Sequence, residues 1–254
     1  MTVGKQFITK CRLKGVVFLT FDVEPDAPPY QTNSYKGVEK GLPWILDLLD
    51  DEDVQATFFT VADLAEKHPD RIKEIVKRGH ELASHGYGHV RLDKLSRQEA
   101  VSNIRKSVSI LSHLSIIKSF RAPNLQPPPI TPSDYTSLGI TVDSSIAAYK
   151  KGRPKHPFAW DSLIVVPATS TSSTIRLPRT LALKYTLPSN RDFHALFYHP
   201  WEFVEIQKKP LYRPDIWVHT GGYAREMLRT VVREAKKRGL VFHVMNEAPS
   251  LVEC

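Results

Sequence analysis

The sequence predicts an α/β protein in which parallel strands close into a barrel that is distorted or incomplete. Two patterns predict this fold: β-branched and aromatic runs alternate with amphipathic stretches of helical period, and roughly seven or eight such runs recur along the chain. Strands separated by helices indicate βαβ units, whose strands pair in parallel. A chain of 254 residues can form one large barrel or two smaller domains. Because no long linker and no internal repeat divides it, we expect residues 1–254 to form a single domain.

In the first third of the chain the two patterns alternate regularly. Short apolar runs predict buried strands, and apolar residues spaced three or four apart predict amphipathic helices. Gly79 ends the second of these helices. In chain order we expect a strand at 16–24, a Pro-rich loop at 25–36, a helix at 37–49, a strand at 55–61, a helix at 62–77 and a strand at 80–84.

The rest of the chain is less regular. Ser96 followed three residues later by Glu99 forms a capping box, which predicts the start of a helix over 96–114. A turn-rich segment lies at 123–132 and a polar Ser/Thr segment at 168–174. We expect further strands at 117–121, 140–144, 163–167 and 194–198, then a last helix at 220–238 and a last strand at 240–245.

Composition and charge exclude several classes of protein. Hydrophobic residues make up 41% of the chain and charged residues 24%, as in an ordinary globular protein. The net charge of +8 favours anionic partners, but the densest basic run, in residues 229–238, has the pattern of a solvated helix face. We therefore expect no nucleic-acid partner. No apolar stretch approaches about 18 residues and residues 1–14 lack a signal-peptide core, so we expect a cytoplasmic protein without a transmembrane segment.

The two cysteines, Cys11 and Cys254, lie near opposite ends of the chain. This number excludes a disulfide framework and a cysteine-based zinc site. It leaves open a single bridge between the termini. The oligomeric state has no signal in the sequence.

Side chains that can transfer protons, bind metal or stabilise charge follow the carboxyl ends of several predicted strands. These ends converge on one rim in a barrel of parallel strands, so we expect a site there. The residues are Asp22, Glu24, His85, His89, Arg121, Asp143 and His199.

The spacing of these residues indicates hydrolytic chemistry at a metal. Asp22 and Glu24 are two apart on a strand, so both carboxylates share a face, where one could bind a metal and the other act as a base. His85 and His89 are four apart, and two imidazoles with one carboxylate make an open metal site. A histidine such as His199 is a natural proton donor to a leaving amine.

An arginine and several aromatic residues are further candidates at this rim. Arg121 could fix a catalytic carboxylate through two hydrogen bonds or form an ordinary rim salt bridge. Trp201, with Tyr30 or Tyr35, could cover the apolar face of a sugar ring or serve only in packing.

Five segments in order resemble the motifs of the polysaccharide deacetylase family (NodB homology, carbohydrate esterase family 4). The resemblance spans about residues 16–248 and implies a distorted (β/α)7 barrel. It implies a metal-dependent hydrolase that removes N-acetyl groups from an amino sugar or polysaccharide and releases acetate. The segments are TFDVE at 20–24, HGYGH at 85–89, RAP at 121–123, VDS at 142–144 and FYHP at 197–200.

The resemblance also implies a role for each matching residue. Asp22 takes the place of the general base and Arg121 that of the residue holding it. His199 takes the place of the general acid, and Asp143 that of the aspartate that tunes it. The backbone N–H near Asn124 corresponds to an oxyanion hole. His85 and His89 take the metal-ligand places.

The first motif departs from the family pattern. Val23 stands where the family has a second, metal-ligating aspartate, and Glu24 is the nearby substitute. We expect a divalent metal, with zinc as the first choice, held by Glu24, His85 and His89. Asn124 stands where the third motif has an aromatic residue, and the tryptophan of the fourth motif is missing after Asp143.

Two other functions stay open. The first is a hydrolase of the same fold that opens a cyclic imide or ureide, with or without metal. The second is a non-catalytic glycan-binding barrel. Val23 favours it, and the joint retention of His85, His89, Arg121 and His199 opposes it. The expected partner is an N-acetylated carbohydrate or a small amide.

Overall fold

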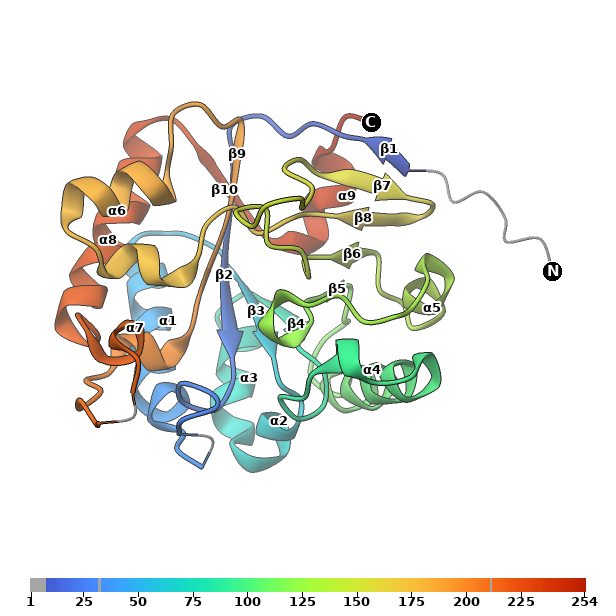
Figure 1. Ribbon diagram of the computed structural model, residues 1–254, viewed down its shortest axis with the longest axis horizontal. Helices are drawn as coiled ribbons and strands as arrows, with labels where there is room; N and C mark the ends of the chain where they lie inside the picture. Colours follow the sequence, from blue (N-terminus) through green and yellow to red (C-terminus); the bar gives the residue numbers. More distant parts are fainter. Residues whose placement is uncertain (1–7, 32, 211) are drawn as a thin grey trace.

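The strands of the protein curl into a single sheet around a buried interior (Figure 1). The computed structural model describes residues 8–31, 33–210 and 212–254. Neighbouring parallel strands follow one another in the order β9, β2, β3, β4, β5, β6 and β8. Their bounds are β2 Val16–Val23, β3 Thr57–Thr60, β4 Glu81–Ser84, β5 Ser119–Phe120, β6 Val142–Asp143, β8 Leu163–Val165 and β9 Phe193–Tyr198.

Three more strands extend this sheet. β10 (Val241–His243) pairs in parallel with the first half of β2, and β3 pairs with the second half. β7 (Phe158–Trp160) runs antiparallel to β8, and β1 (Ile8–Lys10) runs antiparallel to β7. Between β8 and β9 the described residues form no ladder. Instead the backbone N–H of Thr169 donates to the Ala195 carbonyl at 2.8 Å, so the predicted (β/α)7 barrel is confirmed in a curled, incompletely closed form.

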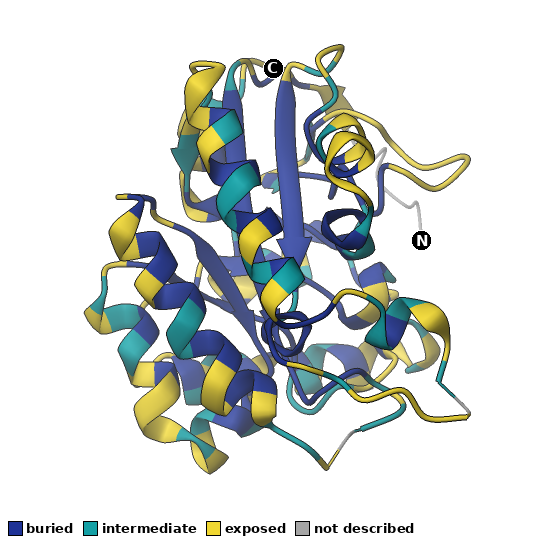
Figure 2. Cartoon of the chain, turned by 90° about the vertical axis from the view of Figure 1, so that its left-hand side faces the viewer, coloured by how far each residue is buried: buried dark blue, intermediate teal, exposed yellow. Residues whose placement is uncertain are grey.

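The helices cover the outside of the sheet and turn their exposed residues to solvent (Figure 2). The predicted capping box of α4 is present, since Ser96 accepts from the Glu99 backbone N–H. The bounds are α1 Leu42–Asp51, α2 Asp63–Lys67, α3 Pro69–Lys77, α4 Arg97–Leu111, α5 Pro132–Ser137, α6 Arg179–Thr186, α7 Pro214–Trp217, α8 Gly222–Lys237 and α9 Ala248–Leu251.

The structure differs from the sequence prediction in a few elements. The helix expected over 62–77 is broken into α2 and α3 at His68, whose φ of −133° and ψ of 56° are not helical. Pro69 explains the break, because a proline disfavours the α conformation in the residue before it. β1, β7 and α6 were not predicted, since these short segments have no clear apolar period.

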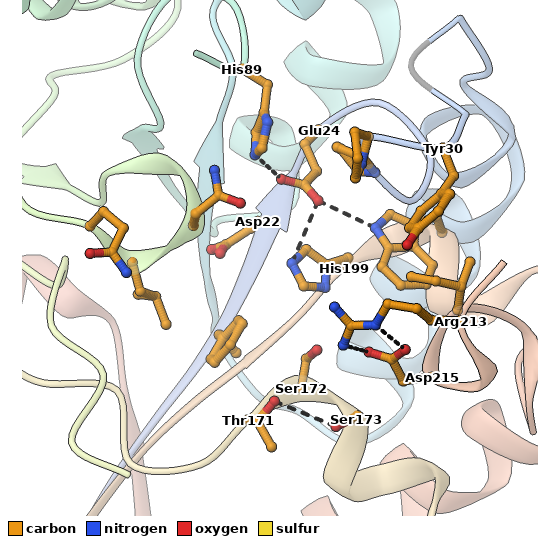
Figure 3. A pocket seen from close by; sticks show the side chains of 18 of the residues that line it. Asp22, Glu24, Tyr30, His89, Thr171, Ser172, Ser173, His199, Arg213 and Asp215 are labelled. Atoms are coloured by element: carbon orange, nitrogen blue, oxygen red, sulfur yellow. Dashed lines mark hydrogen bonds and ion pairs between the residues drawn. The ribbon is translucent and has the colours of Figure 1, made fainter. Parts of the chain in front are cut away.

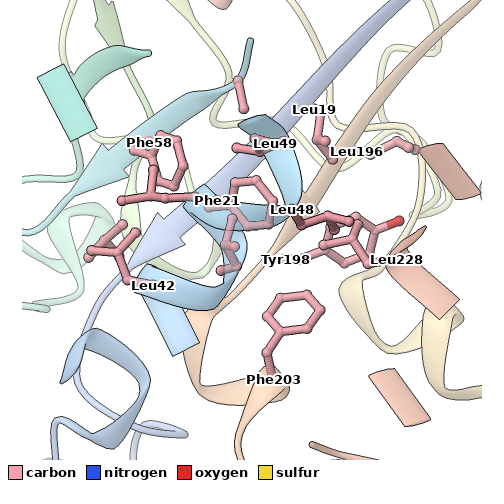
Figure 4. Close-up of a cluster of buried hydrophobic side chains, with 14 of the residues drawn as sticks. Leu19, Phe21, Leu42, Leu48, Leu49, Phe58, Leu196, Tyr198, Phe203 and Leu228 are labelled. Atoms are coloured by element: carbon pink, nitrogen blue, oxygen red, sulfur yellow. The ribbon is translucent and has the colours of Figure 1, made fainter. Parts of the chain in front are cut away.

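Alternation along β2 decides which side chains face the interior. Val17, Leu19 and Phe21 pack outward against the helices in the largest apolar cluster (Figure 4). Val16 and Phe18 face the barrel interior, where they join apolar residues of the other strands. Because side chains alternate between the two faces of a strand, Thr20, Asp22 and Glu24 follow on the inner side.

The two ends of the chain lie together. Cys11 and Cys254 form a disulfide, so the bridge that the sequence left open is present. Arg12 and Glu253 form an adjacent antiparallel bridge. The expectation of no signal peptide rests partly on residues 1–7, which lie outside the described residues. In the described part of the chain, no helix has the length and apolarity needed to cross a bilayer.

Candidate active site

A cavity of about 560 Å³ opens at the carboxyl ends of the strands. Its floor holds groups that sequence analysis singled out, and they lie close together although they come from different strands (Figure 3). The convergence expected from parallel strand ends is therefore what the structure has. The predicted site residues that line the cavity are Asp22, Glu24, Tyr30, His89, Asn124, His199 and Trp201.

Glu24 and the two histidines form a compact cluster. The Glu24 Oε2 atom lies 2.8 Å from His89 Nε2 and 3.7 Å from His85 Nε2. The three candidate ligand atoms all lie within 4.8 Å of one another. Val23, at the position where a metal ligand was missing, faces the outer apolar core instead. Alternation thus gives Glu24, and not its neighbour, the same face as Asp22.

The loop that carries the two histidines is held by α4. Gly86 and Gly88 have φ values of 79° and 67°, which a glycine adopts without the steric cost of a side chain. Asn103 of α4 accepts a hydrogen bond from the Tyr87 backbone N–H at 2.9 Å and donates one to the Tyr87 carbonyl. The HGYGH segment is therefore a braced loop and not a helical turn.

The protonation pattern of His85 suits a metal ligand. Its Nδ1 lies 2.7 Å from the Arg121 carbonyl oxygen, and a carbonyl can only accept, so Nδ1 carries the hydrogen. In the neutral ring Nε2 then presents a lone pair, and this buried atom has no hydrogen-bond partner among the described residues. An imidazole fixed through one nitrogen and open at the other is typical of metal-binding histidines. The residues present therefore fit a divalent metal.

Arg121 holds Asp22 from beneath the cavity. Its Nη1 donates to Asp22 Oδ1 at 2.6 Å and to Thr20 Oγ1 at 2.7 Å. Its Nη2 donates to Ser144 Oγ at 2.9 Å, and the guanidinium lies 4.1 Å over the Phe59 ring. Arg121 is fully buried. Such a buried, multiply bonded guanidinium fixes the position of the carboxylate it holds.

His199 lies between two carboxylates. Its Nε2 is 3.6 Å from Glu24 Oε1, and its Nδ1 is 3.3 Å from Glu202 Oε2. Glu202 also accepts from the His199 backbone N–H at 2.9 Å and faces Arg176 at 3.1 Å. Sequence analysis missed Glu202 and Arg176. A glutamate three residues after His199, with Pro200 first in the turn, is a capping-box pattern that could have indicated Glu202.

Asp143 does not lie where the sequence predicted. It was expected to tune His199, but in the described contacts its carboxylate accepts from the Ser145 hydroxyl, and His199 has Glu202 instead. The register explains the difference. Asp143 pairs with Phe120 and Val165, and both of these pack outward against the helices. Asp143 shares that outer face, whereas His199 points into the barrel.

Trp201 contacts the metal-site carboxylate directly. Its indole N–H donates to Glu24 Oε1 at 3.3 Å, and its ring stacks on His199 with centroids 5.2 Å apart. Gly37 and Gly41 permit this arrangement, because a Cβ atom at either would lie within 2.5 Å of the backbone of Pro200 or Trp201. Trp201 is only 5% exposed, so it offers little surface to a sugar ring.

The two other residues predicted to bind substrate lie in the cavity wall. Asn124 has a positive φ of 62° in the turn after β5. Tyr30 packs on Tyr212 with ring centroids 5.2 Å apart. Both are therefore placed to contact a molecule in the cavity.

The electrostatics of the site favour positive charge beside Glu24. Burial alone would raise the pKa of Glu24, but the facing His199 and His89 hold it well below its ordinary value. Burial would lower the pKa of His199, yet Glu24 and then Glu202 outweigh it and raise the value to about 9. The competition between burial and the charge of Glu24 also raises the pKa of His89. For comparison, at Asp143 outside the cavity burial alone dominates and raises the pKa to about 6. An ionised carboxylate at Glu24 is the form that binds metal.

Comparison with known proteins gives one family. Residues 9–142 match the family model described as polysaccharide deacetylase. The peptidoglycan-N-acetylglucosamine deacetylase of Bacillus cereus is 36% identical over 102 residues, which cover 40% of this chain and 33% of that protein. The chain thus spans about a third of the length of this relative.

Solved structures share the fold at low identity. A CE4 family pseudoenzyme from Bacillus anthracis is 18% identical, with a TM-score of 0.64 over 92% of this chain and 65% of that chain. A family 4 acetyl xylan esterase from Clostridium thermocellum, solved with a cobalt ion, is 20% identical, with a TM-score of 0.60 over 93% and 91%. Since the fold occurs in a pseudoenzyme and in an esterase, the side chains of the site must carry the functional argument.

Proposed function

The chain belongs to the polysaccharide deacetylase family, and from this premise we propose that it is a metal-dependent hydrolase that removes N-acetyl groups from an amino sugar or polysaccharide. The reaction breaks the amide C–N bond and yields acetate and a free amine. One observation carries the proposal: Glu24, His85 and His89 have their ligand atoms within 4.8 Å of one another, and Glu24 and His89 line the same cavity as Asp22 and His199.

Glu24, His85 and His89 would hold the metal. Two imidazoles and one carboxylate, with positions left for water and substrate, are the donor set of catalytic zinc sites, so zinc is the metal we propose. When bound, a divalent metal polarises the amide carbonyl and acidifies the attacking water. Trp201 would keep Glu24 oriented, because its N–H occupies the carboxylate oxygen that is turned away from His89.

Asp22 is the proposed general base. Arg121 occupies its Oδ1, and no described residue hydrogen-bonds to Oδ2, which leaves that oxygen to take a proton from the attacking water. A base of this kind contributes about 10²- to 10⁴-fold to a rate. The backbone N–H near Asn124 would stabilise the oxyanion that forms on the carbonyl.

His199 is the proposed general acid. Nδ1 of His199 contacts Glu202, and Nε2 faces Glu24 in the cavity. Nε2 is therefore the atom that would deliver a proton to the departing amine. Arg176 balances the charge of Glu202. The carboxylate partner that we expected at Asp143 is thus supplied within the same turn as the histidine.

The substrate would contain an N-acetylated sugar, as the name of the Bacillus cereus relative suggests. A cyclic imide hydrolase and a non-catalytic glycan-binding barrel are supported less well. The described site has the carboxylate and imidazole that we propose as base and acid, beside three clustered candidate ligand atoms, and a binding module does not need this combination.

The disulfide bears on the cellular compartment in which the protein folds. Disulfides persist in oxidising environments and are rare in the cytosol, so the Cys11–Cys254 bridge favours an oxidising compartment over the cytoplasmic location that the sequence predicts. Non-reducing mass spectrometry of the protein from fractionated cells tests this.

Metal stoichiometry of chelator-stripped protein tests the proposed function. We expect one zinc per chain, lost in His85→Ala and weakened in Glu24→Gln, together with acetate release from N-acetylchitooligosaccharides. Zinc binding without acetate release from any N-acetylated sugar would favour the imide hydrolase, and no specific zinc would overturn the mechanism.

A further inference from the structure

One wall of the cavity carries positive charge that the proposed mechanism does not use. Residues 149–156, YKKGRPKH, follow β6, and all eight are exposed. Tyr149 and Lys150 line the cavity together with Asp22 and His199. No aspartate or glutamate occurs from residue 144 to residue 160. The sequence therefore places a basic loop, without local acidic residues, at the edge of the candidate active site.

The other Lys and Arg side chains that line this cavity are neutralised by carboxylates. Each forms an ion pair at 3.1 Å or closer, and each acidic partner belongs to the protein itself. Among the described lining residues, Lys150 is the lysine or arginine that has no carboxylate within ion-pair distance. The neutralised pairs are Arg91 with Asp93, Arg176 with Glu202, and Arg213 with Asp215.

The loop is braced by its own hydrogen bonds. The Ala148 backbone N–H donates to the Ala168 carbonyl at 2.8 Å, which ties the loop to the strand region beside it. Lys155 Nζ donates to the carbonyl oxygens of Ala148 and Lys150, so its charge serves the loop. Gly152, with φ of +75°, makes the turn.

Three cations of the loop remain without a carboxylate partner in the described structure: Lys150, Lys151 and Arg153. Neighbouring like charges repel one another, and an anion between them removes that repulsion. Phosphate and carboxylate oxygens are the groups that lysine and arginine bind best. The position of the loop at the cavity edge puts such an anion next to whatever molecule occupies the cavity.

We propose that this basic loop binds a phosphate or carboxylate group that the substrate carries beside its N-acetyl sugar. The inference rests on the proposed deacetylase function and narrows its substrate class to anionic N-acetylated sugars. Lys150 contacts the anion from the cavity wall, and Lys151 and Arg153 attract it from outside. Uncharged chitin-like oligosaccharides would bind without this contact.

A matched pair of ligands tests the proposal: N-acetylglucosamine and N-acetylglucosamine 1-phosphate, which differ by one phosphate. Titration calorimetry of the wild type measures binding of each without requiring turnover. We expect the phosphorylated sugar to bind roughly tenfold more tightly at low salt, and the difference to shrink as salt screens the contact. Equal affinity for both sugars would overturn the proposal.

A double variant, Lys150→Ala with Lys151→Ala, then assigns the effect to the loop. We expect it to weaken binding of the phosphorylated sugar about fivefold to tenfold and to leave the neutral sugar unchanged. The matched control is Lys73→Ala with Lys237→Ala, which removes the same charge from exposed positions on α3 and α8. If the control has the same effect, or if the loop variant weakens both sugars alike, the loop is not an anion site.

Acetate release separates this inference from the proposed function. If the wild type deacetylates both sugars with equal kcat/KM and no salt dependence, the deacetylase stands and the anion site falls. If the phosphorylated sugar binds through the loop but neither sugar nor N-acetylchitooligosaccharides release acetate, the anion site stands and the deacetylase proposal falls. Competition with inorganic pyrophosphate is a last test. Pyrophosphate should displace the phosphorylated sugar, and failure to displace it would show that the phosphate of the sugar does not bind at the loop.

Discussion

The mouth and the lower interior of the barrel each contain a buried glutamate, and the two differ in their partners. Glu81 at the start of β4 accepts from Thr57 Oγ1 at 2.7 Å, from Ser119 Oγ at 2.6 Å and from the Asn246 backbone N–H at 3.0 Å. Glu24 at the mouth faces imidazole and indole nitrogens beside an open cavity. Both carboxylate oxygens of Glu81 accept hydrogen bonds from neutral, fixed donors, whereas Glu24 lies with His85 and His89 in the cluster that we propose as the metal site.

The direction of the pKa shifts follows this difference. Burial raises the pKa of Glu81, and its hydroxyl and N–H donors oppose the shift only in part. For Glu24 the nearby imidazoles outweigh burial and lower the pKa. The comparison teaches that burial alone does not make a carboxylate functional. The charge of its partners and access to a cavity distinguish a site from a structural anchor.

The largest effect is expected at the mouth. Asp22→Asn keeps the size of the side chain and a hydrogen-bond acceptor for Arg121 but removes the base. We expect kcat for acetate release to fall about 10³-fold, with zinc still bound and the fold retained at a lower thermal midpoint, because the buried Arg121 loses its ion-pair partner. Steady-state kinetics and calorimetry measure the three quantities. Activity near that of the wild type would remove Asp22 from the mechanism.

The second prediction contrasts the mouth histidines with two that face the outer side. Burial lowers the pKa of His80 and of His194 to about 4 each. The charge of Asp50 opposes this shift only in part at His80, and at His194 the charges of Arg191 and Arg238 add to it. When the pKa of a histidine is lower in the folded than in the unfolded state, its full contribution to folding stability is present at pH values above the unfolded pKa, near 6.5. That stability is lost as the pH falls from there toward 4.

We expect the two histidines together to cost roughly 3 kcal/mol of folding stability at pH 5 relative to pH 7. Thermal denaturation across this range measures the loss, and His194→Gln should flatten it. His113→Gln is the control, since His113 is exposed. The groups with raised pKa values, His199 and Asp143, act in the opposite direction over this range, so the comparison between variants decides: a His194→Gln variant whose midpoint changes with pH as that of the wild type does contradicts the prediction.

The third prediction separates stability from function. Glu81→Ala leaves the Thr57 and Ser119 hydroxyls and a backbone N–H without their acceptor. We expect a loss of about 2 kcal/mol in the free energy of unfolding, with zinc affinity retained. Urea denaturation and zinc titration measure the two effects. The reverse pattern, weakened zinc binding with unchanged stability, is expected of Glu24→Gln and would contradict the comparison if it appeared at Glu81.

The smallest effect is expected at Trp201. Trp201→Phe keeps an aromatic ring against His199 but removes the N–H that orients Glu24. We expect zinc affinity to fall about tenfold, as measured by competition with a chromogenic chelator. Trp160→Phe is the control, because the Trp160 N–H is buried without a partner among the described residues and lies outside the cavity. Equal zinc affinity in all three proteins would show that Trp201 only packs.

Much of the fold and site could be predicted from local pattern. The apolar runs located the principal parallel strands, and Ser96 with Glu99 located the start of α4. Asp22 and Glu24 were expected on one face because β2 is long enough for alternation to be read, and they line one cavity. The pairing of Glu202 with His199 had a local signal that the sequence analysis did not use.

The sequence by itself determined the residue types at the strand ends, the alternation of β2 and the order of strands and helices, because these depend on side chains a few positions apart. Only the tertiary structure decided which face Asp143 occupies, which carboxylate meets His199 and where Trp201 donates its N–H. β6 is two residues long, too short for its own pattern to fix its face. Its register against β5 and β8 fixes it, and register is a property of the assembled sheet.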